Sequence, residues 1–382
     1  MAAQGENVVP DAVGPVTLPV VWLLGTSGVG KSTSGYRLLS ALADAGVTAA
    51  FVDADQLRLA SGIGASETGL IASSLPALDR GFRDNGAELL VVGGLADDAE
   101  HLSALLPGVP RDRVLAVCLE ADADRIRERV RQRGWLLELT EDAVAYAHAM
   151  RPDFADLRID TTCRPPEDVV ASIAEAALAH LTRSGPATVP LGAEPSLTAP
   201  NTVIMIAGPG GAGISTVGYQ TFSRLAGRGA AVAYLDIHQL GFLGRDGGSR
   251  GHVSMSARNA AAVTSCLAGA GAQTVVLSGD PASIRLLERS WGRDVVTKAF
   301  WLHASPEALA ERIGRRARGE GPPLQGNHRR GLSGPALDDS IAAAVAESES
   351  IDLRPERAHV IDTSRLTAGE VADAMLACFT TH

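Results

Sequence analysis

Short apolar runs alternate with longer amphipathic stretches along the first half of the chain. Five of these runs have the length of a buried strand: residues 20–24, 49–52, 89–92, 114–119 and 157–159. After the first run, apolar residues recur at helical spacing over 31–45, and helical patterns also separate the later runs. The alternation predicts an α/β fold, in which a mainly five-stranded parallel sheet carries helices on both faces.

The second half of the chain repeats features of the first half in the same order. The segment Gly-Thr-Ser-Gly-Val-Gly-Lys-Ser at 25–32 returns 183 residues later as Gly-Pro-Gly-Gly-Ala-Gly-Ile-Ser at 208–215. Asp53, at the end of an apolar run, returns at the same offset as Asp236. Such internal similarity is typical of a chain built from two copies of one structural unit.

Two further features repeat, and they locate an insertion in the second copy. Arg129 and Arg133 return 183 residues later as Arg312 and Arg316. The motif Asp-Thr-Thr at 160–162 returns as Asp-Thr-Ser at 362–364, where the offset is 202 residues. About 19 extra residues therefore follow Arg316, and the stretch 318–334 holds His328, Arg329 and Arg330 among Gly and Pro. We expect either a lid or a disordered loop there.

Residues 183–200 separate the two copies and are rich in Pro, Gly, Ser and Thr, which is typical of a linker. We therefore predict a flexible N-terminus at 1–17, a first domain at 18–182, a linker at 183–200 and a second domain at 201–382. Both domains should have the same fold. We expect them to pack against each other within the chain.

Composition narrows the classes of partner. The chain has 44 acidic residues against 34 Lys and Arg, so its net charge is −10, which disfavours nucleic acid as a partner. No apolar run approaches the length of about 18 residues that a membrane helix needs. The four cysteines are scattered and form no C-x-x-C pair, as expected of a protein in a reducing cytoplasm.

Both copies are predicted to be tandem phosphate-loop (P-loop) domains, because in each a strand, a loop with the spacing of a phosphate-binding motif and a helix follow one another. In the first copy this loop is the segment 25–32. Its glycines let successive N–H groups point at an anion, and the helix adds its positive N-terminal dipole. Lys31 reaches the β- and γ-phosphates, and the Ser32 hydroxyl is a ligand for Mg²⁺. The predicted contacts to ATP and Mg²⁺ are Gly25, Thr26, Ser27, Gly28, Val29, Gly30, Lys31, Ser32 and Thr33.

Catalytic roles are predicted for Lys31, Asp53, Arg129 and Arg133. Asp53 ends the second strand, where ligands of α/β sheets lie, so it can orient or deprotonate a hydroxyl or hold Mg²⁺ through water. The alternative is an aspartate that only caps the turn after the strand. Arg129 and Arg133 lie four residues apart on one helix and can neutralise a transferring phosphoryl group. The alternative is a solvated charged face.

The stretch 21–33, followed by Val52-Asp53-Ala-Asp55, resembles the opening of adenylylsulfate kinases and related P-loop small-molecule kinases. The spacing Arg129-x-x-x-Arg133 is similar to the lid entry of nucleotide and shikimate kinases. The chain also resembles actinobacterial proteins described as AAA-family ATPases. The resemblance implies an ATP-binding five-stranded sheet, with a phosphoacceptor near the acid after the second strand. The stretch 53–58 lacks the glycine and asparagine of adenylylsulfate kinases, which leaves the acceptor open.

The second copy carries Ile214 where the first has Lys31, so we expect little or no phosphoryl transfer there. Its loop either binds nucleotide weakly or is purely structural. The favoured function is an ATP- and Mg²⁺-dependent phosphotransferase acting on a small metabolite or nucleotide. The alternative is a nucleotide-dependent regulatory protein with slow ATP hydrolysis.

Overall fold

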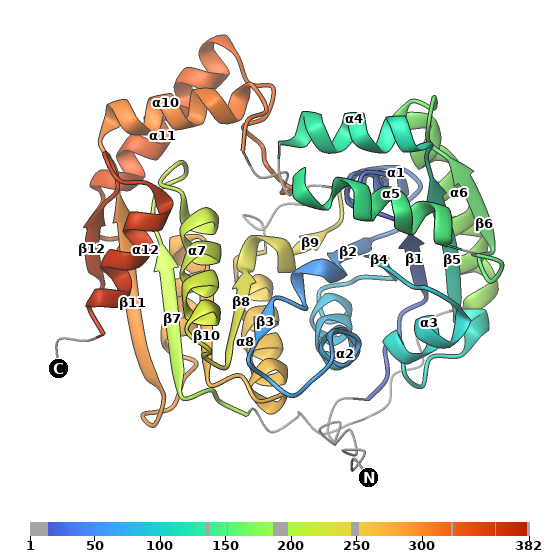
Figure 1. Cartoon of the computed structure of the whole chain (residues 1–382), viewed down its shortest axis with the longest axis horizontal. Helices are drawn as coiled ribbons and strands as arrows, with labels where there is room; N and C mark the ends of the chain where they lie inside the picture. The colour runs from blue at the N-terminus through green and yellow to red at the C-terminus, as the bar shows by residue number, and fades with distance from the viewer. Residues whose placement is uncertain are drawn as a thin grey trace.

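The computed structural model describes residues 14–134, 137–150, 152–185, 198–245, 252–321, 324–355 and 357–379. Most of the predicted flexible N-terminus (1–13) and of the predicted linker (186–197) lies outside these residues. Two α/β units stand side by side, one built from each half of the chain (Figure 1). No helix in the described ranges is long and apolar enough to cross a membrane, and all four cysteines are free.

The first half forms the predicted parallel sheet, and each of the five predicted strands is confirmed. The strands are β1 (Val20–Leu24), β2 (Ala49–Asp53), β4 (Leu89–Gly93), β5 (Val114–Glu120) and β6 (Leu157–Asp160). They lie in the order β6-β5-β1-β4-β2, so β1 is central and the chain winds outward in both directions. The carboxyl end of the central strand is where ligands bind in such doubly wound sheets.

Helices cover both faces of this sheet, as predicted. One face packs against α1 (Lys31–Asp44) and α6 (Pro166–Ser184), and the other against α2 (Glu67–Arg83) and α3 (Ala99–Leu105). After β5, the chain forms α4 (Ala123–Arg133) and α5 (Thr140–Ala149). A short 3-10 turn (Ala54–Gln56) follows β2. Of the apolar residues of α1 that the helical pattern selects, Leu38, Leu39 and Leu42 are fully buried and Tyr36 is partly buried.

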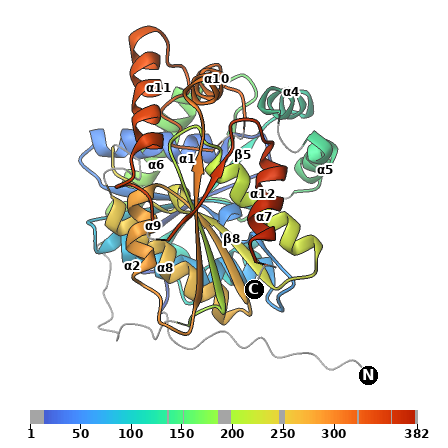
Figure 2. The same cartoon turned by 90° about the vertical axis from the view of Figure 1, so that its left-hand side faces the viewer.

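The second half repeats this architecture. Its strands are β7 (Thr202–Ala207), β8 (Val232–Asp236), β10 (Thr274–Ser278), β11 (Val296–His303) and β12 (His359–Asp362), in the equivalent order β12-β11-β7-β10-β8. Its helices are α7 (Ile214–Gly227), α8 (Val253–Gly269), α9 (Pro281–Glu288), α10 (Pro306–Ala317), α11 (Gly334–Glu349) and α12 (Ala368–Ala377). Helices α7 and α12 cover one face of the sheet, and α8 and α9 cover the other (Figure 2). The predicted fold class, two tandem P-loop α/β domains, is confirmed.

A feature that the sequence did not predict is a reciprocal exchange of edge strands. Strand β3 (Ala60–Ser61) leaves the first half and pairs antiparallel with β8, while β9 (Phe242–Leu243) leaves the second half and pairs with β2. The two pairings are equivalent, because Ala50 and Ala233 are 183 residues apart, and so are their partners Ala60 and Leu243. Each sheet therefore has six strands, and neither outer edge at the junction stays unpaired.

The two halves also share one hydrophobic core, which lies between α2 and α8. Leu75, Leu78 and Phe82 of α2 belong to the same buried cluster as Val263 and Leu267 of α8. The predicted packing of one half against the other is therefore a continuous apolar interface. Because burial of apolar surface drives folding, we expect the two halves to unfold together rather than in separate steps.

Close contact between α2 and α8 depends on Gly81. A Cβ at this position would collide with the amide oxygen of Asn259, which is buried and whose Nδ2 donates to Leu240 O at 2.8 Å. We expect Gly81→Ala to destabilise the protein by about 1–2 kcal/mol through overpacking. Gly227→Ala, at a helical glycine with open space around it, should be neutral or stabilise by up to about 1 kcal/mol. Thermal unfolding measures both, and equal melting temperatures for the two variants would contradict the prediction.

Candidate functional site

The glycines of the first loop have conformations and contacts that exclude a side chain. Gly25 has φ of 133°, and a Cβ there would collide with the carbonyl oxygen of Leu119 on β5. Gly28 and Gly30 have φ of 90° and 105°, in the left-handed region that glycine adopts without strain. The backbone therefore curls back between the end of β1 and the start of α1. The sequence predicted this curl from the glycine spacing alone.

The curled loop presents backbone donors that fit an anion. Within the described part of the chain, the N–H groups of Ser27, Gly28 and Gly30 donate no hydrogen bond. Helix α1 begins at Lys31, and its N-cap Gly30 supplies no side-chain hydrogen bond to the first turn. Since the first turn of a helix has N–H groups without an internal partner, this end of α1 adds further donors and a positive dipole. The donor set fits the phosphates of a nucleotide.

Lys31 lies inside this cradle. Its side chain is buried, and its Nζ donates to the carbonyl oxygens of Gly25 at 2.7 Å and Thr26 at 3.0 Å. Burial lowers the pKa of Lys31, while the nearby carboxylates of Asp55 and Asp53 act in the opposite direction. The ammonium group is thus held next to the loop donors by neutral carbonyl groups, which leaves its positive charge for an anionic ligand.

Ser32 and Asp53 meet where α1 begins and β2 ends. The Ser32 hydroxyl donates to Asp53 Oδ2 at 2.6 Å, and Asp55 N donates to Asp53 Oδ1 at 3.1 Å. Burial raises the pKa of Asp53 to about 6, the negative charge of Asp55 adds to the rise, and the Ser32 hydroxyl and Lys31 oppose it. Asp53 is therefore a carboxylate whose proton is exchanged close to neutral pH.

A hydroxyl and a carboxylate side by side suit Mg²⁺, which prefers oxygen ligands and usually keeps several waters. In the described ranges, no group of three or more His, Cys, Asp or Glu residues could hold a metal ion. A site that draws one or two ligands from Ser32 and Asp53, with the rest from water and phosphate, needs no such group. These two residues therefore fit the ion that accompanies a nucleotide.

Arg129 lies beneath the loop and binds backbone rather than facing the cradle. Its Nη1 donates to Gly28 O at 3.2 Å and to Thr161 Oγ1 at 2.9 Å, and its Nη2 donates to Thr161 O at 2.6 Å. Arg312 makes the same bonds to Thr363 in the second half, at 2.9 and 2.5 Å. In each half this contact joins the helix after the fourth parallel strand (α4 or α10) to the end of the fifth (β6 or β12). A structural contact therefore explains why the arginine recurs in a copy without the lysine.

This contact predicts a stability effect that is the same in both halves. Arg129→Met and Arg312→Met should each destabilise the protein by about 1.5–3 kcal/mol, because carbonyl groups lose a charged donor. Arg131→Met is the control, since Arg131 lies on the same helix and is exposed. Chemical denaturation measures the three variants. A normal stability of Arg129→Met combined with a loss of turnover would instead assign Arg129 to catalysis.

Arg133 lies at the rim of the loop, one turn further along α4. Its Nη2 donates to the Ser27 hydroxyl at 3.1 Å. Burial lowers the pKa of Arg133, while the charges of Asp53 and Asp55 oppose this change. Of the four residues with predicted catalytic roles, the structure thus brings Lys31, Asp53 and Arg133 together around the loop and places Arg129 below it.

The second loop has the same curl, but side chains of the second half lie against its backbone N–H groups. Gly211 and Gly213 have φ of 99° and 92°, like their counterparts in the first half. The N–H of Gly210 donates to Glu347 Oε2 of α11 at 3.1 Å, and a Cβ at Gly210 would collide with the guanidinium of Arg329. The sequence did not reveal Glu347, because Ala145 takes its place in the first copy at the offset of 202 residues.

No protein-family model matches the chain, and no curated protein matches it. Among solved structures, the shikimate kinase of Acinetobacter baumannii in complex with shikimate is 22% identical, over 43% of this chain and 95% of its own, with a TM-score of 0.30. The adenylylsulfate (APS) kinase of Mycobacterium tuberculosis in complex with AMPPNP and APS is 22% identical, over 42% of this chain and 98% of its own, with a TM-score of 0.30. A gluconokinase from Sinorhizobium meliloti is 22% identical, over 45% and 95%, with a TM-score of 0.28.

Each of these matches covers less than half of the chain. The assignment of the fold comes from the order of the parallel strands and from the loop that follows the central one. Each half has the fold of a P-loop α/β domain. The first half keeps the lysine of the loop, and the second half has Ile214 at that position.

Proposed function

We propose that the first half binds ATP with Mg²⁺ and transfers a phosphoryl group to a small metabolite or nucleotide. The observation that carries this proposal is the meeting of three groups at the carboxyl end of the sheet. The Lys31 ammonium lies within the curled loop, and Ser32 Oγ lies 2.6 Å from Asp53 Oδ2. A buried positive charge beside a hydroxyl–carboxylate pair is the arrangement that a triphosphate with its ion requires.

Each residue of the site has a role in this proposal, and Asp53 has two. The N–H groups of the loop and Lys31 hold the phosphates, and Ser32 with Asp53 holds Mg²⁺. When bound, ATP supplies the phosphoryl group, and Mg²⁺ neutralises part of its charge. Arg133 stabilises negative charge at the rim of the loop. The carboxylates of Asp53 and Asp55 orient the acceptor hydroxyl, and positioning with charge neutralisation provides most of the rate in such transfers.

The second half takes no part in phosphoryl transfer in this proposal. Its loop lacks the lysine, and the carboxylate of Glu347 accepts the Gly210 N–H that would otherwise face a phosphate. A negative charge at this position repels a polyphosphate, so the chain should bind one nucleotide rather than two.

An alternative is a nucleotide-dependent regulator with slow ATP hydrolysis, in which binding at the first loop changes the packing of the halves. The shared core and the exchanged edge strands favour this alternative, because they couple the two halves mechanically. The formation of ADP in the presence of a panel of sugars, acids and nucleotides separates the two functions. A kinase is stimulated strongly by its acceptor, whereas a regulator hydrolyses ATP at a rate that no metabolite changes.

A further inference from the structure

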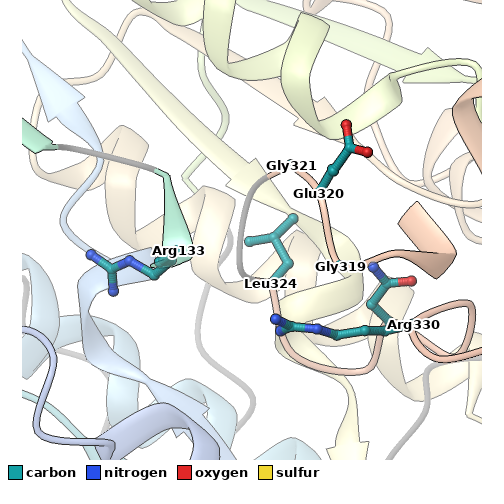
Figure 3. Close-up of a pocket in the computed structure, with 7 residues that line it drawn as sticks. Arg133, Gly319, Glu320, Gly321, Leu324 and Arg330 are labelled. Carbon is teal, nitrogen blue, oxygen red and sulfur yellow. The ribbon is translucent and has the colours of Figure 1, made fainter. Parts of the chain in front are cut away.

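The extra segment of the second half reaches the phosphate site of the first half. We call residues 318–334 the insert; the structure describes all of it except 322–323. A small pocket has one wall from the first half, Arg133 of α4, while the rest comes from the insert: Gly319, Glu320, Gly321, Leu324, Asn327 and Arg330 (Figure 3). Since Arg133 also bonds to Ser27 of the first loop, the pocket adjoins that loop.

The charges that line this pocket are mainly positive. Within the described part of the chain, the Arg330 guanidinium makes no hydrogen bond or ion pair. Arg133 Nε is buried and has no hydrogen-bond partner. Glu320, the only carboxylate among the described lining residues, accepts hydrogen bonds from Arg315 and Arg318 at 2.8 and 3.1 Å and points away from Arg133 (Figure 3). The guanidinium of Arg330 points from the insert toward the side on which Arg133 lies, while the guanidinium of Arg133 points away from the insert and bonds to Ser27 of the first loop (Figure 3). Positive charge on this side of the pocket attracts an anion.

The second half fixes the position of the insert. Gln239 of the turn after β8 donates from Nε2 to Gln325 O at 3.3 Å, and Gly326 faces the ring of Phe242. Arg329, next to Arg330, has its guanidinium against Gly210 of the second loop. Gln239 and the second loop therefore hold the insert on the second half, while Phe242 on the exchanged strand β9 holds it at the junction of the two halves.

We propose that Arg330 is a binding residue of the first half's site, supplied by the second half, and that it binds a phosphate-type oxyanion together with Arg133. This inference rests on the proposed function and adds a role for the degenerate half. The oxyanion belongs either to the terminal phosphate of ATP or to an anionic group of the acceptor. Both present oxygen atoms that guanidinium groups bind with two hydrogen bonds.

Calorimetric titration of the full chain tests the role of Arg330 with three probes: MgADP, Mg-AMPPNP, and inorganic phosphate added to the MgADP complex. If Arg330 binds the terminal phosphate of ATP, Arg330→Ala lowers the affinity for Mg-AMPPNP about 10- to 100-fold and leaves the affinity for MgADP unchanged. If Arg330 instead binds an anionic group of the acceptor, Arg330→Ala lowers the affinity for inorganic phosphate by a similar factor and leaves the affinity for both nucleotides unchanged. Arg318→Ala is the matched control, because it removes the same charge from the same insert and keeps both guanidinium groups of the pocket.

Affinities of Arg330→Ala equal to those of the wild type for all three probes would overturn the inference, as would an equal loss in Arg318→Ala. Failure of the proposed function gives a different result. In that case the wild type binds neither nucleotide, or Lys31→Ala binds both as tightly as the wild type, and the inference about Arg330 is overturned with it. Unchanged melting temperatures of the two arginine variants, expected for exposed side chains, show that the effects are local.

Discussion

Replacing Lys31 with alanine should weaken MgATP binding at least 100-fold, whereas Ile214→Ala should leave it unchanged. Among the residues that the structure describes, the ammonium group of Lys31 is the only full positive charge inside the first loop, because Arg129 lies below the loop and Arg133 at its rim. Loss of a buried charge that pairs with a polyphosphate costs several kcal/mol of binding energy, because the remaining donors are neutral amides. Titration calorimetry measures the affinity and the stoichiometry.

Ile214 is the matched control because it occupies the equivalent position in a loop of the same shape. A stoichiometry of one nucleotide per wild-type chain, reduced to no measurable binding in Lys31→Ala, would support both the first site and the closed second loop. A stoichiometry of two nucleotides per chain would contradict the proposal that Glu347 keeps a polyphosphate out of the second loop. Tight MgATP binding by Lys31→Ala would contradict the proposed function itself.

The fold could be predicted from the sequence where local patterns determine local structure. Runs such as 20–24 and 114–119 carry the apolar signature of buried parallel strands, and each became a strand of the expected sheet. Gly28 and Gly30 predicted a curled loop because glycine adopts a positive φ without strain. The position of Lys31 then follows from the start of the helix. Repetition at a fixed offset extended the same prediction to the second half.

The features that were missed depend on contacts between distant parts of the chain. Strands β3 and β9 have two residues each, which is too short for any periodic pattern, and their partners lie in the opposite half. The contact of Glu347 with Gly210 joins residues 137 positions apart. Arg129 shows the reverse problem: its recurrence was visible, but the sequence could not show that the carbonyl oxygens of Gly28 and Thr161 accept its hydrogen bonds.

Asp53→Asn should abolish most of the ATP turnover and at the same time stabilise the folded protein at pH 8. The amide keeps the acceptor for Asp55 N–H but can neither take a proton nor carry the charge that holds Mg²⁺, so turnover should fall by about 10²- to 10⁴-fold. Asp236→Asn, the equivalent change in the second half, should leave turnover unchanged. Steady-state release of ADP measures both variants.

The stability effect follows from the pKa of Asp53, which burial raises from 3.8 to about 6. Above pH 6 the folded protein carries a carboxylate that is less favourable than in the unfolded chain, so removal of the charge stabilises the fold. As the pH falls through 6 toward 4, the wild type takes up a proton in the folded state and regains this stability. We expect Asp53→Asn to gain about 1–2 kcal/mol at pH 8, since water screens part of the penalty, and the gain to vanish near pH 4.

Ionisation of Asp53 should also govern the activity of the wild type, which should rise with pH where the stability falls. Only the deprotonated Asp53 can accept a proton or bind Mg²⁺, so kcat/KM should rise with pH through a pKa near 6. The residue thus lowers stability in the pH range where it supports turnover, as is common for catalytic groups. A stability gain of Asp53→Asn that is the same at pH 8 and pH 5 would show that the charge of Asp53 is not its cause. The raised pKa, and with it the expected pH profile, would then be wrong.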